Sequence, residues 1–69
     1  MTREKYQVTI TFDNNDYLQT YFNALNVDEI ISHYDGYTME YYNGEETKAW
    51  ALEIKNMSTK ENTIHYYGE

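Results

Sequence analysis

The strongest restriction on the fold is a strict alternation of apolar and polar residues near the start of the chain. The two sets are Tyr6, Val8, Ile10 and Phe12 on one side and Gln7, Thr9 and Thr11 on the other. Because successive side chains of a β-strand point to opposite faces, this pattern predicts a strand over residues 5–12 with one face buried. Four turn-forming residues follow, Asp13 to Asp16, and predict a turn.

The next segment, residues 17–23, fits two structures. As a strand, its even-numbered residues share one face and its odd-numbered residues share the other, and it forms a hairpin with the first strand. As a helix, it places Leu18, Phe22 and Leu25 on one stripe. We favour the strand, because Tyr, Thr and Phe prefer extended backbone and a stronger helix start lies downstream.

That helix start is Asn26. Asn26 suits the N-cap position, and Glu29 then occupies the third helical position, as in a capping box. Apolar residues recur at helical spacing after it: Val27, Ile30, Ile31 and Tyr34. Gly36 suits the position just past the helix end. The pattern predicts a helix of about two turns that depends on tertiary packing.

The second half of the chain predicts antiparallel strands. A strand over Tyr37–Tyr42 leads into Asn43-Gly44, a strong hairpin signal, and a return strand covers residues 47–56. A last short strand covers residues 63–67, after a polar connection. The expected fold is α+β: a small antiparallel sheet in the order β-β-α-β-β-β, with one short helix packed on one face.

The pairing of the second hairpin follows from its expected loop. A loop of two or four residues around Asn43-Gly44 pairs odd positions with even positions. We therefore expect one face of this hairpin to contain Tyr37, Met39 and Tyr41 together with Lys48, Trp50 and Leu52. The return strand would direct its apolar residues to the core: Trp50, Leu52 and Ile54.

Length and composition restrict the classes of protein. A chain of 69 residues is too short for two domains, so we expect one domain over residues 1–69. With no Cys and two His, the chain lacks the residues for a disulfide framework or a structural zinc site. We expect no cofactor. No apolar run approaches the ~20 residues of a membrane span, and the N-terminus has no apolar signal region, so we expect a cytoplasmic protein.

The net charge of −7 disfavours direct binding of nucleic acid, which draws affinity from Lys and Arg. It favours a basic partner, such as a protein that itself binds nucleic acid. Catalytic groups are sparse. Ser32 and His33 are neighbours on the predicted helix and point in different directions, and His65 is the only other imidazole. We therefore predict that the chain is not an enzyme.

The nine tyrosines divide into two groups. Four have core or core-edge positions in the predicted fold: Tyr6, Tyr34, Tyr37 and Tyr41. Five remain for the surface: Tyr17, Tyr21, Tyr42, Tyr66 and Tyr67. Such tyrosines either pack along amphipathic strands or contact a partner, because Tyr offers stiff, amphipathic contact area. Both roles stay open at the level of sequence.

The acidic residues form local groups: Asp13 with Asp16, Asp28 with Glu29 and Asp35, and Glu45 with Glu46, while Glu40 and Glu53 face outward on the second hairpin. These groups either keep the protein soluble or imitate the phosphates of nucleic acid, whose spacing is similar to that of alternate strand residues. The residues expected to bind a partner are Asp28, Glu29, Glu40, Tyr42, Glu45, Glu46 and Tyr67.

The first half of the chain resembles a family of small acidic phage proteins, the uracil-DNA glycosylase inhibitors. The shared features are a first strand of the form Tyr6-x-Val8-Thr9, the acidic turn, a Tyr-rich second strand and a short helix that closes at Tyr34 with Gly36. The Trp-containing hairpin of residues 37–56 has no counterpart there. The resemblance implies a manner of action: an acidic, aromatic surface that occupies a DNA-binding protein. No functional residue is transferred from it.

These observations lead to two hypotheses of different classes. The first is a non-enzymatic protein of a phage or mobile element that binds and inhibits a basic, DNA-handling host protein. The alternative is a small homodimeric structural or regulatory protein, joined through a sheet edge or its Tyr-rich face, whose acidity serves solubility alone. A tyrosine platform for single-stranded nucleic acid would need a basic groove, which five Lys and Arg residues do not provide.

Overall fold

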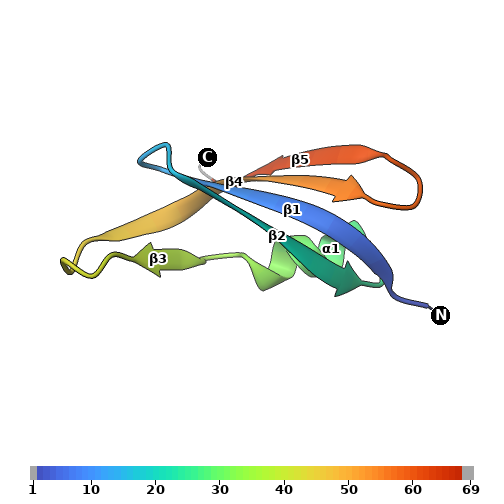
Figure 1. The fold of residues 1–69 in the computed structure, drawn as a ribbon, viewed down its shortest axis with the longest axis horizontal. Helices are drawn as coiled ribbons and strands as arrows, with labels where there is room; N and C mark the ends of the chain where they lie inside the picture. The colour runs from blue at the N-terminus through green and yellow to red at the C-terminus, as the bar shows by residue number, and fades with distance from the viewer. Residues whose placement is uncertain (1, 68–69) are drawn as a thin grey trace.

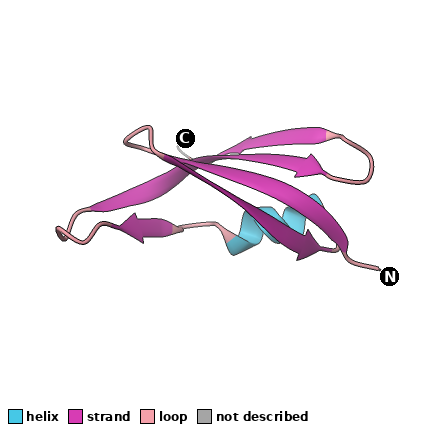
Figure 2. Ribbon diagram, viewed as in Figure 1, coloured by secondary structure: helices cyan, strands magenta, loops and turns pink. Residues whose placement is uncertain are grey.

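The structure, a computed structural model, describes residues 2–67. In chain order its elements are β1 (Glu4–Phe12), β2 (Tyr17–Ala24), α1 (Val27–His33), β3 (Thr38–Glu40), β4 (Glu46–Asn56) and β5 (Asn62–Tyr66) (Figures 1 and 2). The α+β class and the order β-β-α-β-β-β confirm the sequence prediction. The segment that fitted both a strand and a helix is a strand.

The five strands form one curled antiparallel sheet. β1 lies between β2 and β4, and β4 pairs along its other edge with β3 and with β5. The sheet bends into half a barrel, and α1 lies beneath its concave side (Figure 1). This arrangement gives the sheet an inner face that packs on the helix and an outer face that is open to solvent. The helix has seven residues, and no helix in the described part of the chain is long and apolar enough to cross a membrane.

The β1–β2 hairpin closes through a three-residue loop. The N–H of Phe12 donates to the carbonyl of Asp16 over 2.8 Å, and the N–H of Asn15 donates to the carbonyl of Phe12 over 3.0 Å. Asn15 has a φ of 73°, in the left-handed region where Asn is tolerated better than most residues. The sequence expectation of a turn over Asp13 to Asp16 is confirmed.

The β3–β4 hairpin has the same kind of loop. The N–H of Tyr41 donates to the carbonyl of Glu45 over 2.8 Å, which leaves Tyr42–Gly44 as the loop. Gly44 has a φ of 93°, a left-handed conformation that Gly adopts without steric cost. The strand predicted over Tyr37–Tyr42 was too long, because β3 ends at Glu40.

This three-residue loop sets the register of the hairpin. With an odd number of loop residues, odd positions of β3 pair with odd positions of β4. Met39 lies opposite Thr47, and Thr38 lies opposite Lys48. The expected pairing of odd with even positions was therefore wrong, because it assumed that Asn43 and Gly44 form a loop of two or four residues.

A β-bulge interrupts β4 at Trp50. Thr11 of β1 lies opposite Ala51, whereas the next residue, Phe12, lies opposite Ala49. Trp50 thus has no partner in β1. Such an extra residue bends the strand and increases its twist.

The bulge reverses which side chains of β4 face the core. Before it, the odd residues Thr47 and Ala49 are buried; after it, the even residues Leu52 and Ile54 are buried. Trp50 itself lies 44% exposed. The expectation that Trp50 faces the core was wrong, because the two-residue period of the strand breaks at this position.

The core lies between the inner face of the sheet and α1. Its largest fully buried side chains come from β1, β4 and the helix: Phe12, Ile10, Ile30, Leu52, Ile54 and Val8. Burying one such side chain stabilises the fold by about 1.5–3 kcal/mol. Aromatic rings then connect the elements edge to face: Tyr34 of the helix end lies 6.0 Å from Phe22 and 5.2 Å from Tyr37 between ring centroids.

Reciprocal side-chain contacts fix the start of α1. The carbonyl oxygen of the Asn26 side chain accepts from the N–H of Glu29 over 2.9 Å, as predicted. The carboxylate of Glu29 reaches one residue further back than in a standard capping box and accepts from the N–H of Leu25 over 2.8 Å. The other oxygen of Glu29 forms an ion pair with Arg3 at 2.9 Å, which ties the helix to the chain just before β1.

We predict that Asn26→Ala lowers the free energy of unfolding by about 1 kcal/mol, because the N–H of Glu29 loses its acceptor. Urea unfolding followed by circular dichroism measures the change. Asn26→Asp is the matched control, since Asp also accepts at the N-cap, and it should keep most of the stability. An unchanged midpoint in Asn26→Ala would contradict this role for the cap.

Candidate protein-binding surface

The β1–β2 loop lies against the second hairpin at one end of the molecule. The hydroxyl of Thr47 donates to the carboxylate of Asp13 over 2.5 Å. The hydroxyl of Tyr41 donates to the carboxylate of Asp16 and accepts from the side-chain amide of Asn14 over 2.8 Å. These contacts join residues that are 25 to 34 positions apart in the chain.

These contacts bring acidic residues of both hairpins together at this end. We call this set the acidic tip: Asp13, Asp16, Glu40, Glu45 and Glu46. All five side chains are exposed, and the tip holds five of the chain's twelve carboxylates. Lys48 is the one basic residue in the two loop segments, 13–16 and 40–48. The tip is therefore a concentrated negative patch at one end of an elongated molecule of 41 × 24 × 17 Å.

Like charges meet directly across the hairpin strands of the tip. Glu40 lies opposite Glu46 in the β3–β4 register. Like charges in directly opposite strand positions destabilise a sheet, because their Cβ atoms are about 5 Å apart. The pKa of Tyr41 is raised, first by its hydrogen bond to Asp16 and also by the negative charges of Asp16 and Glu45. The local field thus holds the Tyr41 hydroxyl in its protonated, donating form.

An exposed aromatic side chain projects from the tip. Tyr42 occupies the first position of the β3–β4 loop and is fully exposed. The same loop has an internal contact, in which the side-chain oxygen of Asn43 accepts from the N–H of Glu45 over 3.0 Å. A large, stiff side chain beside several carboxylates is suited to contact a partner.

A second group of aromatic residues lies on the outer face of the sheet. Trp50 and Tyr66 pack edge to face at 5.3 Å between ring centroids. Tyr17 belongs to the same cross-strand row as Tyr66, through Thr11 and Ala51. We call Tyr17, Trp50 and Tyr66 the aromatic patch; their exposed fractions are 70%, 44% and 53%.

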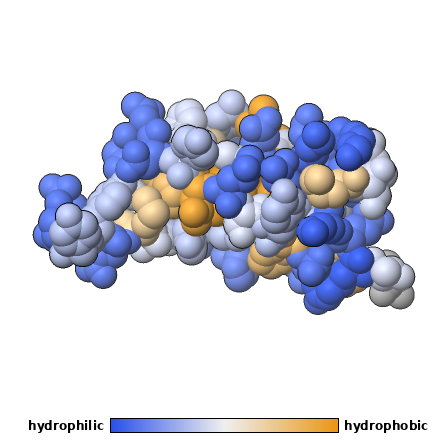
Figure 3. All heavy atoms as spheres, in the orientation of Figure 1, coloured by the Kyte–Doolittle hydropathy of each residue, from blue (hydrophilic) through white to orange (hydrophobic). Residues whose placement is uncertain are grey.

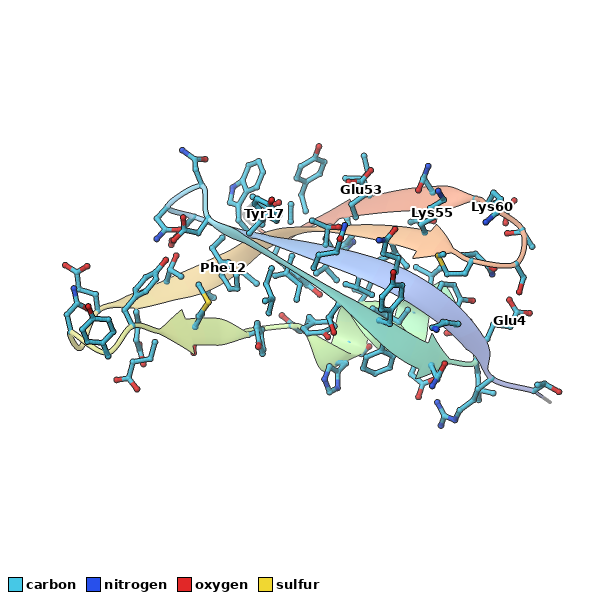
Figure 4. The ribbon with its side chains drawn as sticks, in the orientation of Figure 1. Glu4, Phe12, Tyr17, Glu53, Lys55 and Lys60 are labelled. Carbon is cyan, nitrogen blue, oxygen red and sulfur yellow. The ribbon has the colours of Figure 1, made fainter. Side chains whose placement is uncertain are left out.

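The acidic tip and the aromatic patch adjoin. A shallow hollow between them is lined by Asp13, Lys48, Ala49, Trp50 and Tyr67. Tyr17 directly follows Asp16 and is labelled near the top of the molecule in Figure 4. Hydrophilic side chains cover the end of the molecule that holds the tip (Figure 3). Asp13 and the partly exposed Trp50 line the same hollow, so negative charge lies next to an exposed ring.

The sequence-predicted partner residues divide between the two ends of the molecule. Four of them meet at the tip: Glu40, Tyr42, Glu45 and Glu46. Asp28 and Glu29 lie in the first turn of α1, which follows the far end of β2. An eight-residue strand spans about 25 Å, so these two carboxylates do not join the tip.

Glu29 has structural contacts of its own. The N–H of Leu25, followed by the hydrogen bond and the charge of Arg3, lowers the pKa of the Glu29 carboxyl. Its two oxygens are occupied by these groups, whereas Asp28 is exposed. Glu29 therefore holds the helix start in place.

Tyr67 is less accessible than the sequence suggested. Its ring packs against the core, and its hydroxyl donates to the carbonyl of Ile31 over 2.5 Å. Burial, followed by the charge of Asp35, raises its pKa to about 12. The expectation that Tyr67 is exposed was wrong, because the chain after β5 turns the side chain towards α1. The other four tyrosines expected at the surface are exposed: Tyr17, Tyr21, Tyr42 and Tyr66.

Five residues of the surface were absent from the predicted partner set: Asp13, Asp16, Tyr17, Trp50 and Tyr66. Tyr17 and Tyr66 were expected to be exposed but were not assigned to a partner. Asp13 and Asp16 were recognised as an acidic group, but only tertiary contacts place them beside the second hairpin. Trp50 was assigned to the core. The sequence around Trp50 continues a regular apolar alternation and gave no indication of the bulge that turns Trp50 outward.

The histidines lie apart from the tip. His33 packs 4.7 Å from Phe22 and 4.7 Å from Tyr34 between ring centroids, and His65 lies 4.8 Å from Tyr67. Within residues 2–67, no three His, Asp or Glu side chains form a group that could hold a metal ion. The prediction that the chain is not an enzyme stays a prediction.

Comparisons with known proteins yield no relationship: no family model, no curated protein and no solved structure matches the chain.

We predict that in alkali the free energy of unfolding falls less steeply with pH in Tyr67→Phe than in the parent chain. The unfolded chain releases this proton near pH 10 and the folded chain near pH 12, so the folded state binds more protons between these values. The free energy of unfolding accordingly falls as the pH rises from about 10 to about 12. Urea titrations across this range measure the slope.

Tyr17→Phe is the matched control, because it removes an exposed hydroxyl from the same sheet. It should keep the alkaline slope of the parent chain. Tyr67→Phe should also cost about 1 kcal/mol at neutral pH, since the carbonyl of Ile31 loses its donor. Equal alkaline slopes in all three proteins would show that Tyr67 keeps no raised pKa.

Proposed function

We propose that this chain is a non-enzymatic protein of a phage or mobile element that binds and inhibits a basic, DNA-handling host protein in the cytoplasm. The observation that supports this proposal best is the acidic tip. Five carboxylates from two hairpins, among them the opposed pair Glu40 and Glu46, lie at this end, where hydroxyl groups donate to Asp13 and Asp16. A partner with Lys and Arg side chains relieves this repulsion on binding.

The grouping of carboxylates at the tip fits a partner whose own surface normally contacts phosphates. The tip presents its carboxylates from strand ends and loops. A DNA-binding groove lined by Lys and Arg would attract the tip, and its occupation would exclude DNA.

The exposed rings supply contact area and orientation. Arg side chains stack on Tyr and Trp faces, and such contacts contribute about 0.5–2 kcal/mol each. Tyr42 at the tip and Trp50 in the aromatic patch offer these faces next to carboxylates. Charge then accelerates the encounter, and the rings slow dissociation.

The experiment is affinity capture from host lysate followed by identification of the bound proteins. We predict that the captured protein is basic and binds DNA, and that the purified chain displaces DNA from it in a mobility-shift competition. Glu45→Lys with Glu46→Lys should weaken capture at least tenfold, because two attractions at the tip become repulsions. Added salt should weaken capture of the parent chain steeply.

The matched control is Glu53→Lys with Glu61→Lys. It changes the net charge by the same amount at two exposed positions outside the tip. Capture by this variant should stay within a few-fold of the parent. If both double variants lose capture equally, the total charge of the chain determines binding and the tip does not. If neither variant loses capture and added salt has no effect, the electrostatic proposal fails.

We also predict that the purified chain does not bind DNA or RNA directly. Its net charge of −7 repels phosphate. Fluorescence anisotropy with labelled single-stranded and duplex oligonucleotides at low salt measures this. Saturable binding in the micromolar range would favour a tyrosine platform for nucleic acid and contradict the proposal.

A further inference from the structure

The outer strand β2 has an unprotected edge. Within residues 2–67 it pairs with β1 alone, so its other side is free. Its eight residues, YLQTYFNA, contain no charge and no proline, and its register with β1 has no shift. Proteins usually protect such an edge with Lys, Pro or a bulge, because an open row of N–H and C=O groups recruits another strand.

The hydrogen-bond pattern identifies the backbone groups that point outward. The N–H of Phe12 donates to the carbonyl of Asp16, so these two residues form a hydrogen-bonded pair. Such pairs alternate along an antiparallel ladder, and the even residues of β2 therefore bond to β1. The odd residues direct N–H and C=O towards the free edge: Tyr17, Gln19 and Tyr21. Asn23 belongs to the same set, and its carbonyl accepts from the guanidinium of Arg3 over 3.2 Å.

The two ends of this edge have opposite charge. Asp13 and Asp16 lie in the loop before β2. At the other end, the guanidinium of Arg3 lies on the edge itself, and Lys5 lies one strand away, opposite Asn23. An antiparallel copy of the same strand would bring each acidic end against a basic end. In a dimer with a two-fold axis this contact between an acidic and a basic end forms twice, because the axis relates the two ends of the interface.

We propose that β2 pairs with β2 of a second copy of this chain, antiparallel and about a two-fold axis at Gln19. In this register Gln19 faces Gln19 of the second copy, and Tyr17 faces Tyr21. All three residues point their backbone groups outward, and together they form about six hydrogen bonds across the axis. The two sheets become one continuous sheet.

This register also fits the charges at the ends of the strand. Asn23 faces Asn15 of the second copy, so Arg3 keeps its bond to Asn23 and meets Asp16 of that copy. Of the acidic tip, the interface engages Asp16 and leaves Glu40, Glu45 and Glu46 free, together with Tyr42. The inference therefore does not depend on the proposed function.

The first test is sedimentation velocity across micromolar to millimolar concentrations. The parent chain should show a reversible monomer–dimer equilibrium. Gln19→Lys should raise the dissociation constant about tenfold or more, because two ammonium groups then face each other at the axis. Asn62→Lys is the matched control: it adds the same charge at an exposed position of β5, and its dimer should persist.

The second test exchanges the charges at the two ends of β2. Arg3→Glu and Asp16→Arg should each weaken the dimer, and the double variant should restore it. Within one copy these positions lie about 20 Å apart along β2, so restoration requires contact between copies. Glu29→Gln is the control for the lost Arg3 ion pair, and it should leave the dimer intact.

Hydrogen exchange gives an independent measurement on the folded parent chain. The N–H groups of Tyr17, Gln19 and Tyr21 should become protected as the concentration rises, while those of Leu18 and Thr20 are protected throughout. A monomer at all concentrations would overturn the proposal. A dimer whose dissociation constant is unchanged by Gln19→Lys and by the charge exchange would also overturn it, because its interface would then lie elsewhere. Glu45→Lys with Glu46→Lys should keep the dimer, which separates this result from any failure of the acidic tip.

Discussion

The shape of the molecule depends on the bulge at Trp50, because β4 takes part in three ladders at once. Its first residues pair with β3, and its later residues pair with β1 and β5. Without the extra residue, an inward Ala49 would require an inward Ala51 and outward Leu52 and Ile54. The bulge lets both halves of the strand direct apolar residues to the same core. It also turns Trp50 outward, next to Tyr66.

The acidic tip depends on that geometry and on a few hydrogen bonds from neutral hydroxyl donors. The side chains of Tyr41 and Thr47 hold the β1–β2 loop against the second hairpin by donating to Asp16 and Asp13. The donors are hydroxyl groups, so they organise the carboxylates without neutralising them. A salt bridge at the same place would have held the loops equally well and removed the negative field. The tip is thus stabilised in a way that keeps its charge available.

Much of the fold could be predicted because the relevant interactions are local. The alternation from Tyr6 to Phe12, the Asn26 cap and the helical stripe of α1 each involve residues within a few positions of one another. Errors appeared where a residue's environment depends on a distant strand. Trp50 continues an apolar alternation in sequence, yet its register against β1 places it outside. Tyr67 resembles an exposed terminal tyrosine, yet its hydroxyl donates to Ile31 on the helix.

The sequence by itself determined the class of fold, the positions of the strands and helix, and a strongly negative, tyrosine-rich surface. These properties follow from side-chain periodicity, capping and composition, which act over short distances. Only the tertiary structure decided which carboxylates act together: Asp13 and Asp16 join Glu45 and Glu46, while Asp28 and Glu29 lie at the other end. The physical reason is that loop length and a single bulge set the strand register, and register determines which distant side chains become neighbours.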